Sequence, residues 1–244
     1  MAIELPNLAR LRLCEPDDAE DGDWFYALAG ASRPKWKPWK RLRGSDKAVF
    51  RALADRSEND RYSAGQYEGS YSGVDIDVII RQRLWSVEHI VPRSRINGRR
   101  PGVAEDDPFG WVLETRQENS RRRNYPLVLW KTGAVEPALI EVDGVVHYDF
   151  DDASKGRVAR KWLYIRAVYG GVDDIDPMTE AQRRHLDEIL EIATGRLDYA
   201  EGRYHLLLVD WVTKTFGSPW QNPLLGDDRL EILRDRRFRA MVVG

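Results

Sequence analysis

Two short segments, about thirty residues apart, contain the side chains with the clearest chemical potential. Residues 88–92 read EHIVP and residues 119–124 read NSRRRN. A hard cation such as Mg2+ prefers oxygen ligands, which the Glu88 carboxylate and the Asn119 carboxamide would supply. A neutral imidazole titrates near physiological pH, so His89 could accept a proton from a water molecule. Together these groups predict hydrolysis of a phosphodiester with a single divalent ion.

Arginines close to these segments would complete such a site. Arginine is permanently charged and its planar guanidinium fits phosphate, so it would stabilise charge on the phosphoryl oxygens. The candidates are Arg99, Arg100 and Arg122. In-line attack by water would leave the phosphate on the 5′ side of the product. We expect Mg2+ as the ion, with Mn2+ or Ca2+ as alternatives.

The elements that must position these side chains are two strands and a helix. The patterns predict a strand over residues 85–91 that ends at a proline, a second strand over 109–113 and a short helix over 114–123. In a regular strand Glu88 and His89 point to opposite faces. Both can therefore reach one site only if the first strand ends or bends at that point.

The patterns from residue 139 onwards predict a hairpin followed by helices, so the expected fold class is α+β. Residues 139–148 read as a hairpin around Asp143-Gly144, a typical turn sequence. Apolar residues at helical spacing predict helices over 153–169, 179–193, 202–216 and 227–239. Thr179 is the expected N-cap of the second of these helices. Three further histidines are expected to be structural, His147 on a strand surface and His185 and His205 in helices.

Composition limits the classes of protein to which the chain can belong. The 244 residues are 42% hydrophobic and 32% charged, as in soluble globular proteins. The net charge of −2 gives no global basic field, so a nucleic-acid partner would have to be met by local patches. The single cysteine excludes an intrachain disulfide and a multi-cysteine zinc site. We see no signal peptide or membrane span, which favours a cytoplasmic or virion-associated protein without a membrane partner.

Residues 33–43 form a basic arm with interleaved tryptophans, and two prolines favour an extended segment there. The side chains expected to contact nucleic acid are Lys35, Trp36, Lys37, Trp39, Lys40, Arg41 and Arg43. The lysine and arginine side chains would follow a phosphate backbone, while the tryptophans would stack on nucleobases. An arm whose tryptophans pack on the protein core is the alternative interpretation.

The ordered set of motifs resembles the bacterial endonuclease I family of ββα-metal (HNH-like, His-Me finger) nucleases. That family carries a Glu-His-x-x-Pro strand end, which residues 88–92 match. An Asp stands twelve residues before an Asn-x-x-Arg-x-Asn segment, as Asp107 does before residues 119–124 here. Residues 156–164, GRVARKWLY, are similar to the family's Gly-x-x-Ala-Arg helix with its Leu-Tyr continuation. The resemblance extends over about residues 85–195.

The resemblance implies how the chain is divided. A ββα-metal core would occupy about residues 85–124, within a nuclease domain of residues 85–244. Residues 1–84 have no counterpart in the family, and we expect them to be an N-terminal extension packed on that core. Family members cut DNA, and often RNA, with little sequence preference.

The resemblance also implies a role for each matched residue. Glu88 and Asn119 would hold the metal ion, and His89 would be the general base. Either Arg99 or Arg100 would contact the scissile phosphate. The residues expected to orient the finger rather than bind metal are Asp107 and Asn124.

Two departures from the family pattern keep other functions open. The sequence PFG at residues 108–110 replaces the His-His pair that often follows the family's Asp, and the family's C-terminal signature is only faintly matched. A nucleic-acid-binding or assembly protein that kept the finger but lost catalysis is one alternative. A sequence-specific or structure-specific HNH nicking or restriction enzyme, with residues 1–84 supplying specificity, is the other. The sequence leaves the oligomeric state open.

Overall fold

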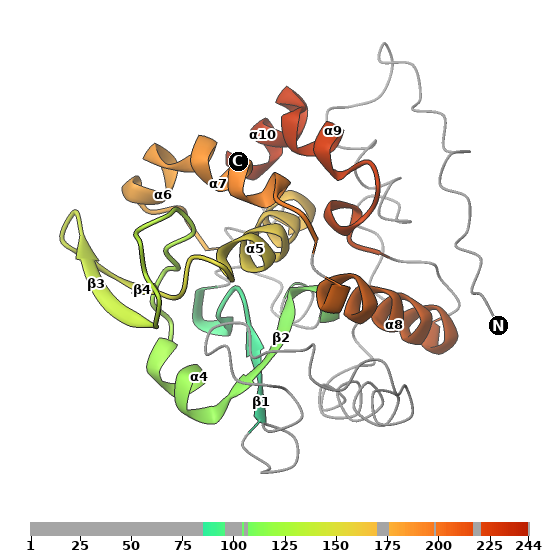
Figure 1. Ribbon diagram of the computed structural model, residues 1–244, viewed down its shortest axis with the longest axis horizontal. Helices are drawn as coiled ribbons and strands as arrows, with labels where there is room; N and C mark the ends of the chain where they lie inside the picture. Colours follow the sequence, from blue (N-terminus) through green and yellow to red (C-terminus); the bar gives the residue numbers. More distant parts are fainter. Residues whose placement is uncertain are drawn as a thin grey trace.

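The structure is a computed structural model of the chain, and it describes residues 85–95, 104, 107–169, 176–197, 199–216 and 221–243. These residues combine helices with two small antiparallel sheets, which confirms the predicted α+β class (Figure 1). The predicted N-terminal extension, the arm at 33–43, and both Arg99 and Arg100 lie outside the described residues. Among the helices that are described, none is long and apolar enough to cross a membrane.

The first sheet pairs strand β1 (Trp85–His89) with strand β2 (Trp111–Thr115). The strands are antiparallel, and the last residue of β1, His89, lies opposite Trp111. Helix α4 (Arg116–Arg122) follows β2 directly and contacts both strands. The Thr115 side chain caps α4 by accepting a hydrogen bond of 3.1 Å from the backbone N–H of Glu118. Two strands and a helix therefore follow in the predicted order, with every boundary within two residues of the one expected.

The chain bends directly after β1. Pro92 cannot donate a ladder hydrogen bond, and the short 3-10 helix η3 (Arg93–Arg95) replaces the strand. The backbone N–H of Ile90 still donates to the carbonyl of Gly110, at 3.0 Å, so pairing with the other strand continues to the bend. Gly110 ends the short helix η4 (Pro108–Gly110), where a Cβ would lie 2.7 Å from the Ile165 side chain. A larger residue at this position would require the Ile165 side chain to move.

The predicted hairpin is confirmed as strands β3 (Ala138–Val142) and β4 (Val145–Asp149). Asp143 and Gly144 join them with φ of 53° and 74°, as a two-residue turn with the twist of the strands requires. His147 is buried, because it lies in the half of β4 that packs on the protein, so its predicted place on the strand surface is wrong.

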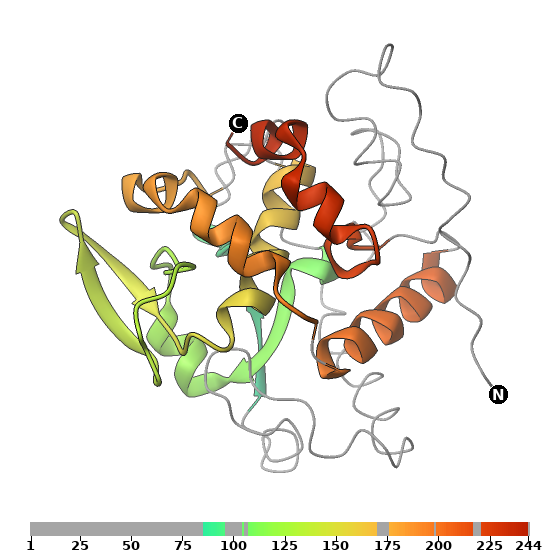
Figure 2. The same cartoon turned by 45° about the horizontal axis from the view of Figure 1, so that its top comes forward.

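Helix α5 (Lys155–Tyr169) lies at the centre of the fold, and Figure 2 shows other helices on several sides of it. Every residue of α5 is buried except Gly156 and Arg157, which are half-buried. The elements that follow are α6 (Glu180–Arg184), α7 (Leu186–Thr194), α8 (Tyr199–Phe216), η5 (Pro223–Leu225), α9 (Arg229–Arg234) and α10 (Arg236–Val243). The helix predicted at 179–193 is thus divided at His185, and the one predicted at 227–239 is divided at Asp235.

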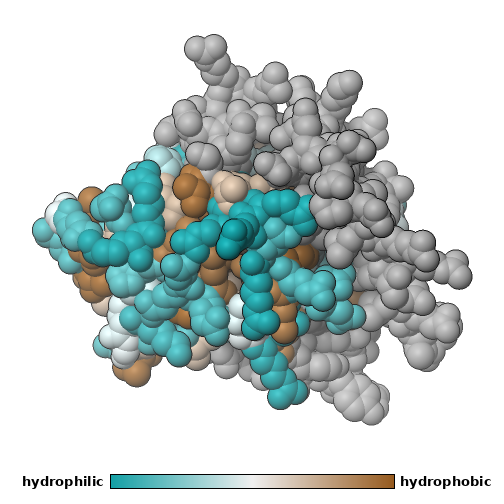
Figure 3. All heavy atoms as spheres, turned by 90° about the horizontal axis from the view of Figure 1, so that it is seen from above, coloured by the Kyte–Doolittle hydropathy of each residue, from teal (hydrophilic) through white to brown (hydrophobic). Residues whose placement is uncertain are grey.

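One hydrophobic core joins the first sheet to these helices. It includes Trp111 on β2 and Trp162 on α5, and it reaches Val242 on α10. The predicted cap of α6 is confirmed, since Thr179 and Gln182 bond reciprocally as a capping box. On the face shown in Figure 3 the surface of the described residues is mainly hydrophilic, as expected of a chain whose apolar residues gather in the core.

Candidate functional site

Helix α4 covers one face of β1, and Asn119 makes the contact. Its amide nitrogen donates to the Ser86 hydroxyl at 2.5 Å and to the Val87 carbonyl at 3.1 Å. Because side chains alternate along a strand, Ser86 and Glu88 share the face that α4 covers. The Asn119 nitrogen is turned towards β1, so the carboxamide oxygen is the atom that can serve a cation.

Glu88 forms a buried ion pair with Arg122 on the same face. The distance from Glu88 Oε1 to Arg122 Nη1 is 2.7 Å, and the two residues are 4% and 1% exposed. The Arg122 guanidinium also donates to the carbonyls of His89, at 3.1 Å, and Ile90, at 2.6 Å. Arg122 thus joins α4 to the end of β1 from inside the protein, whereas the sequence predicted a contact with phosphate.

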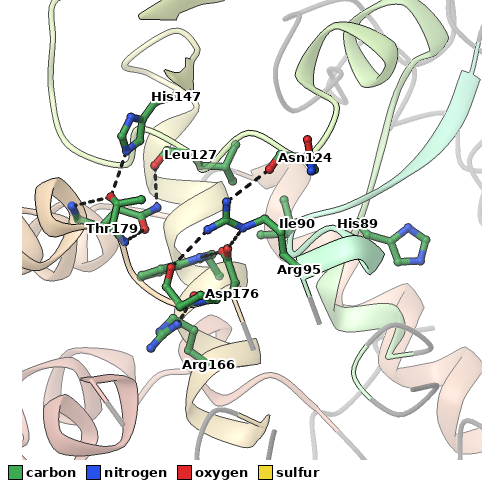
Figure 4. A network of polar contacts seen from close by, with 12 residues as sticks. His89, Ile90, Arg95, Asn124, Leu127, His147, Arg166, Asp176 and Thr179 are labelled. Atoms are coloured by element: carbon green, nitrogen blue, oxygen red, sulfur yellow. Dashed lines mark hydrogen bonds and ion pairs between the residues drawn. The ribbon is translucent and has the colours of Figure 1, made fainter. Parts of the chain in front are cut away.

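His89 does not share this face. It pairs with Trp111 across the ladder, and strand alternation directs its ring to the side opposite Glu88. The half-buried imidazole meets the Trp111 indole edge-on, with ring centroids 5.7 Å apart at an interplanar angle of 62°. Figure 4 shows the His89 ring turned away from the polar network around Arg95. The bend that would bring Glu88 and His89 together begins at Ile90, one residue after the histidine.

Asp107 anchors the turn before β2 to the central helix. Its carboxylate is fully buried and accepts hydrogen bonds from the backbone N–H of Phe109 at 2.9 Å, from the Tyr164 hydroxyl at 2.9 Å and from the Tyr169 hydroxyl at 2.7 Å. Burial raises the pKa of Asp107 to about 6, although these donors lower it. These contacts fix the turn before β2 to α5, and the orienting role expected of Asp107 stays a prediction.

Two further ionisable groups lie beneath the same turn: Lys161, which the sequence did not single out, and His205, which was expected to be structural. Lys161 is buried and donates to the Phe109 carbonyl at 3.4 Å, and burial lowers its pKa to about 8. Burial, and then the charge of Lys161, lower the pKa of His205 to about 3, so its imidazole is neutral. A lysine within the apolar pattern of α5 was the available signal, because an unsatisfied charge there would be costly. Both groups support the fold below the site.

Asn124 makes few contacts near the candidate site, whereas Glu114 is buried within it. The Asn124 side chain is exposed, and its backbone carbonyl accepts a long hydrogen bond of 3.5 Å from Arg95. Glu114, which the sequence did not single out, is fully buried on the same face as Glu88, because it pairs with Ser86 across the ladder. Its carboxylate accepts from the backbone N–H of Thr115 at 2.6 Å. An acid directly after the apolar residues 111–113 was the signal for it.

Glu88 and Asn119 carry the kinds of oxygen atom that a hard cation prefers. A carboxylate and a carboxamide oxygen on one face offer two oxygen ligands, and Mg2+ commonly keeps several waters in its remaining positions. Within the described part of the chain, no group of three or more His, Cys, Asp or Glu side chains could hold a metal ion. Any ion here would thus depend on the amide oxygen and on water. It would also share Glu88 with Arg122.

A cavity of about 500 Å3 lies elsewhere, between the start of α5 and the end of α7. Its lining mixes basic residues such as Lys131 and Arg196 with acidic residues such as Glu191, and it contains none of the residues predicted for the site.

Comparison with known proteins does not assign the chain to a family. No family model matches it, and no match was found among curated proteins.

Proposed function

We propose that this chain is a metal-dependent endonuclease that hydrolyses phosphodiester bonds in DNA, with RNA as an alternative substrate. The observation that carries the proposal is the unit formed by β1, β2 and α4. That unit brings Glu88 and Asn119, which are far apart in the sequence, to one face of a hairpin, with His89 as the last residue of β1. Its element order agrees with the ββα-metal core that the motifs imply.

In this proposal Glu88 and Asn119 hold the ion, and Arg122 positions Glu88. A bound Mg2+ would supply charge that polarises the phosphate and stabilises the departing 3′ oxygen. Arg122 fixes the Glu88 carboxylate and the two carbonyls that follow it, so it acts through the ligand and not on the substrate. This carboxylate, which Arg122 holds through one oxygen, is proposed as a ligand of the cation.

His89 is proposed to accept the proton of the attacking water. It ends β1, and the chain bends at the next residue. The phosphate is proposed to lie across this end of the strand, rather than over the face of the hairpin, so that Glu88 and His89 act on it from the two faces. The edge of the Trp111 indole limits the orientations of the imidazole, which reduces the entropy lost when it meets the substrate.

A plasmid-nicking assay with and without EDTA tests the proposal. Cleavage should require a divalent ion, and His89→Ala should lower the rate about 100-fold to 10,000-fold, because general-base catalysis contributes that much. DNA binding should stay nearly unchanged, since the ring is not needed to attract phosphate. The control is His185→Ala, which removes a half-exposed imidazole stacked on Trp130. Full activity of His89→Ala with Mg2+ present would refute the role of His89 as base.

A second candidate is a nucleic-acid-binding protein that lacks catalysis. The ion pair of Glu88 with Arg122 and the orientation of His89 away from Glu88 favour it, since both differ from a site ready for a metal ion. It predicts binding that EDTA does not change and no cleavage product with any divalent ion. The nuclease predicts product with Mg2+ and none with EDTA.

A further inference from the structure

Asp176 is the centre of a polar network behind the candidate site (Figure 4). One oxygen of its carboxylate accepts from the Arg95 Nε, and the other accepts from the Trp162 indole N–H at 3.0 Å. Its backbone carbonyl accepts from Arg166 at 2.6 Å, and its backbone N–H donates to the carbonyl of Arg95 at 2.9 Å. Every polar group of Asp176 is therefore used, although the residue is only 2% exposed.

Arg95 connects this network to the end of β1. It ends the short helix that follows the bend, six residues after His89. It is held twice by Asp176, once through its side chain and once through its backbone, across 81 residues of sequence. The two remaining guanidinium nitrogens donate to the carbonyls of Pro177, at 3.3 Å, and Asn124, at 3.5 Å. Asn124 follows α4 closely, so Arg95 also touches the end of the helix that carries Asn119.

The backbone of Asp176 is in an unusual conformation. Its φ is +43°, in the left-handed region that few non-glycine residues adopt, although Asn and Asp do so more often than others. Such conformations persist where the surrounding structure fixes them, and they gather at functional sites. Glycine would relieve this conformation, but it would give up the carboxylate that holds Arg95 and Trp162.

We infer that Asp176 is a positioning residue for the nuclease site. Acting through Arg95, it fixes the segment after His89 to α5 on one side and to the end of α4 on the other. The separation between β1, which carries Glu88 and His89, and α4, which carries Asn119, then depends on a carboxylate far away in the sequence. The inference rests on the proposed function for its kinetic consequence, whereas the effect of Asp176 on His89 can be measured without cleavage.

The test uses Asp176→Asn in the full chain. An amide keeps the size of the side chain and tolerates the left-handed backbone, but it can no longer accept from both Arg95 and Trp162. We expect kcat for plasmid nicking to fall at least about 10-fold with KM changed less than about 2-fold, because a misplaced catalytic group loses rate rather than binding. We also expect the His89 imidazole NMR signals to shift. Substituting each of the four histidines in turn assigns those signals.

A matched control and a second variant complete the experiment. Asp187→Asn breaks an exposed Asp–Arg pair, with Arg239, and should leave kcat and the His89 signals unchanged. If Asp176→Asn does not fold, Arg95→Lys keeps the charge of a partly exposed side chain but loses the guanidinium contacts to Asn124 and Pro177, and it should show the same changes. Unchanged His89 signals in a folded variant would overturn the inference. If the wild type does not cleave, the proposed function fails. The His89 imidazole signals of wild type and variant still show whether Asp176 affects the surroundings of His89.

Discussion

The buried carboxylate of Asp107 should make the stability of this protein depend on pH in a direction that can be predicted. Burial raises its pKa from 3.8 to about 6, so the folded chain binds this proton more tightly than the unfolded chain. The carboxyl group is protonated in both states below the unfolded pKa, where burial costs nothing. As the pH rises from about 4 to 6, the unfolded chain ionises first and stability is lost.

The size of the effect follows from the two pKa values. A difference of about 2.2 between 3.8 and 6 corresponds to about 3 kcal/mol of unfolding free energy, fully lost above the folded-state pKa. Asp107→Asn removes the titration and keeps an acceptor for the Phe109 N–H. The variant should therefore gain about 2 kcal/mol of this difference relative to the wild type as the pH is raised from about 4 to about 6.5. Lys161, whose pKa is about 8, stays mostly protonated over this range.

Urea denaturation followed by circular dichroism, at several pH values in this range, measures the difference directly. The control variant Asp227→Asn removes an exposed carboxylate and gives the contribution of lost negative charge alone. If the unfolding free energies of wild type and Asp107→Asn run parallel over the whole pH range, the carboxylate is not destabilised by its burial, and the argument is wrong. A gap that widens in the opposite direction would mean that the three hydrogen-bond donors dominate over desolvation.

Two further substitutions test the contacts that hold the site and the helices. Arg122→Gln leaves Glu88 as a buried carboxylate without its guanidinium partner, so we expect the free energy of unfolding in urea to fall by about 3–5 kcal/mol. A fall below about 1 kcal/mol would show that water reaches the ion pair in solution. Thr179→Ala removes the N-cap of α6 and the hydroxyl that lies 3.0 Å from His147 Nε2, which should lower stability by about 1 kcal/mol, whereas Thr179→Ser should restore most of it.

Local patterns in the sequence predicted much of the fold. The Asp143-Gly144 pair predicted a two-residue turn because both positions require a positive φ, and the hairpin is present. Thr179 predicted a helix start, and its side chain caps α6. Each of these depends on neighbours within a few residues, where the covalent chain itself brings the groups together.

Predictions that depended on the orientation or burial of a single side chain did less well. His147 was expected on a strand surface and is buried, because the last half of β4 packs on the core. Arg122 was expected to face phosphate and instead pairs with Glu88 inside the protein. Strand periodicity assigns a side chain to one of two faces, but it does not say which face another element will cover.

The sequence by itself determined the order of strand, strand and helix, and it placed an acid and an amide on the first strand and on the helix. Tertiary structure alone decided that Asn119 lies over β1, that Arg122 neutralises Glu88 and that Asp176 holds Arg95 from 81 residues away. The physical reason is the range of the forces involved. Turns, caps and periodicity act between near neighbours, whereas burial and ion pairing join groups that only the folded chain brings together.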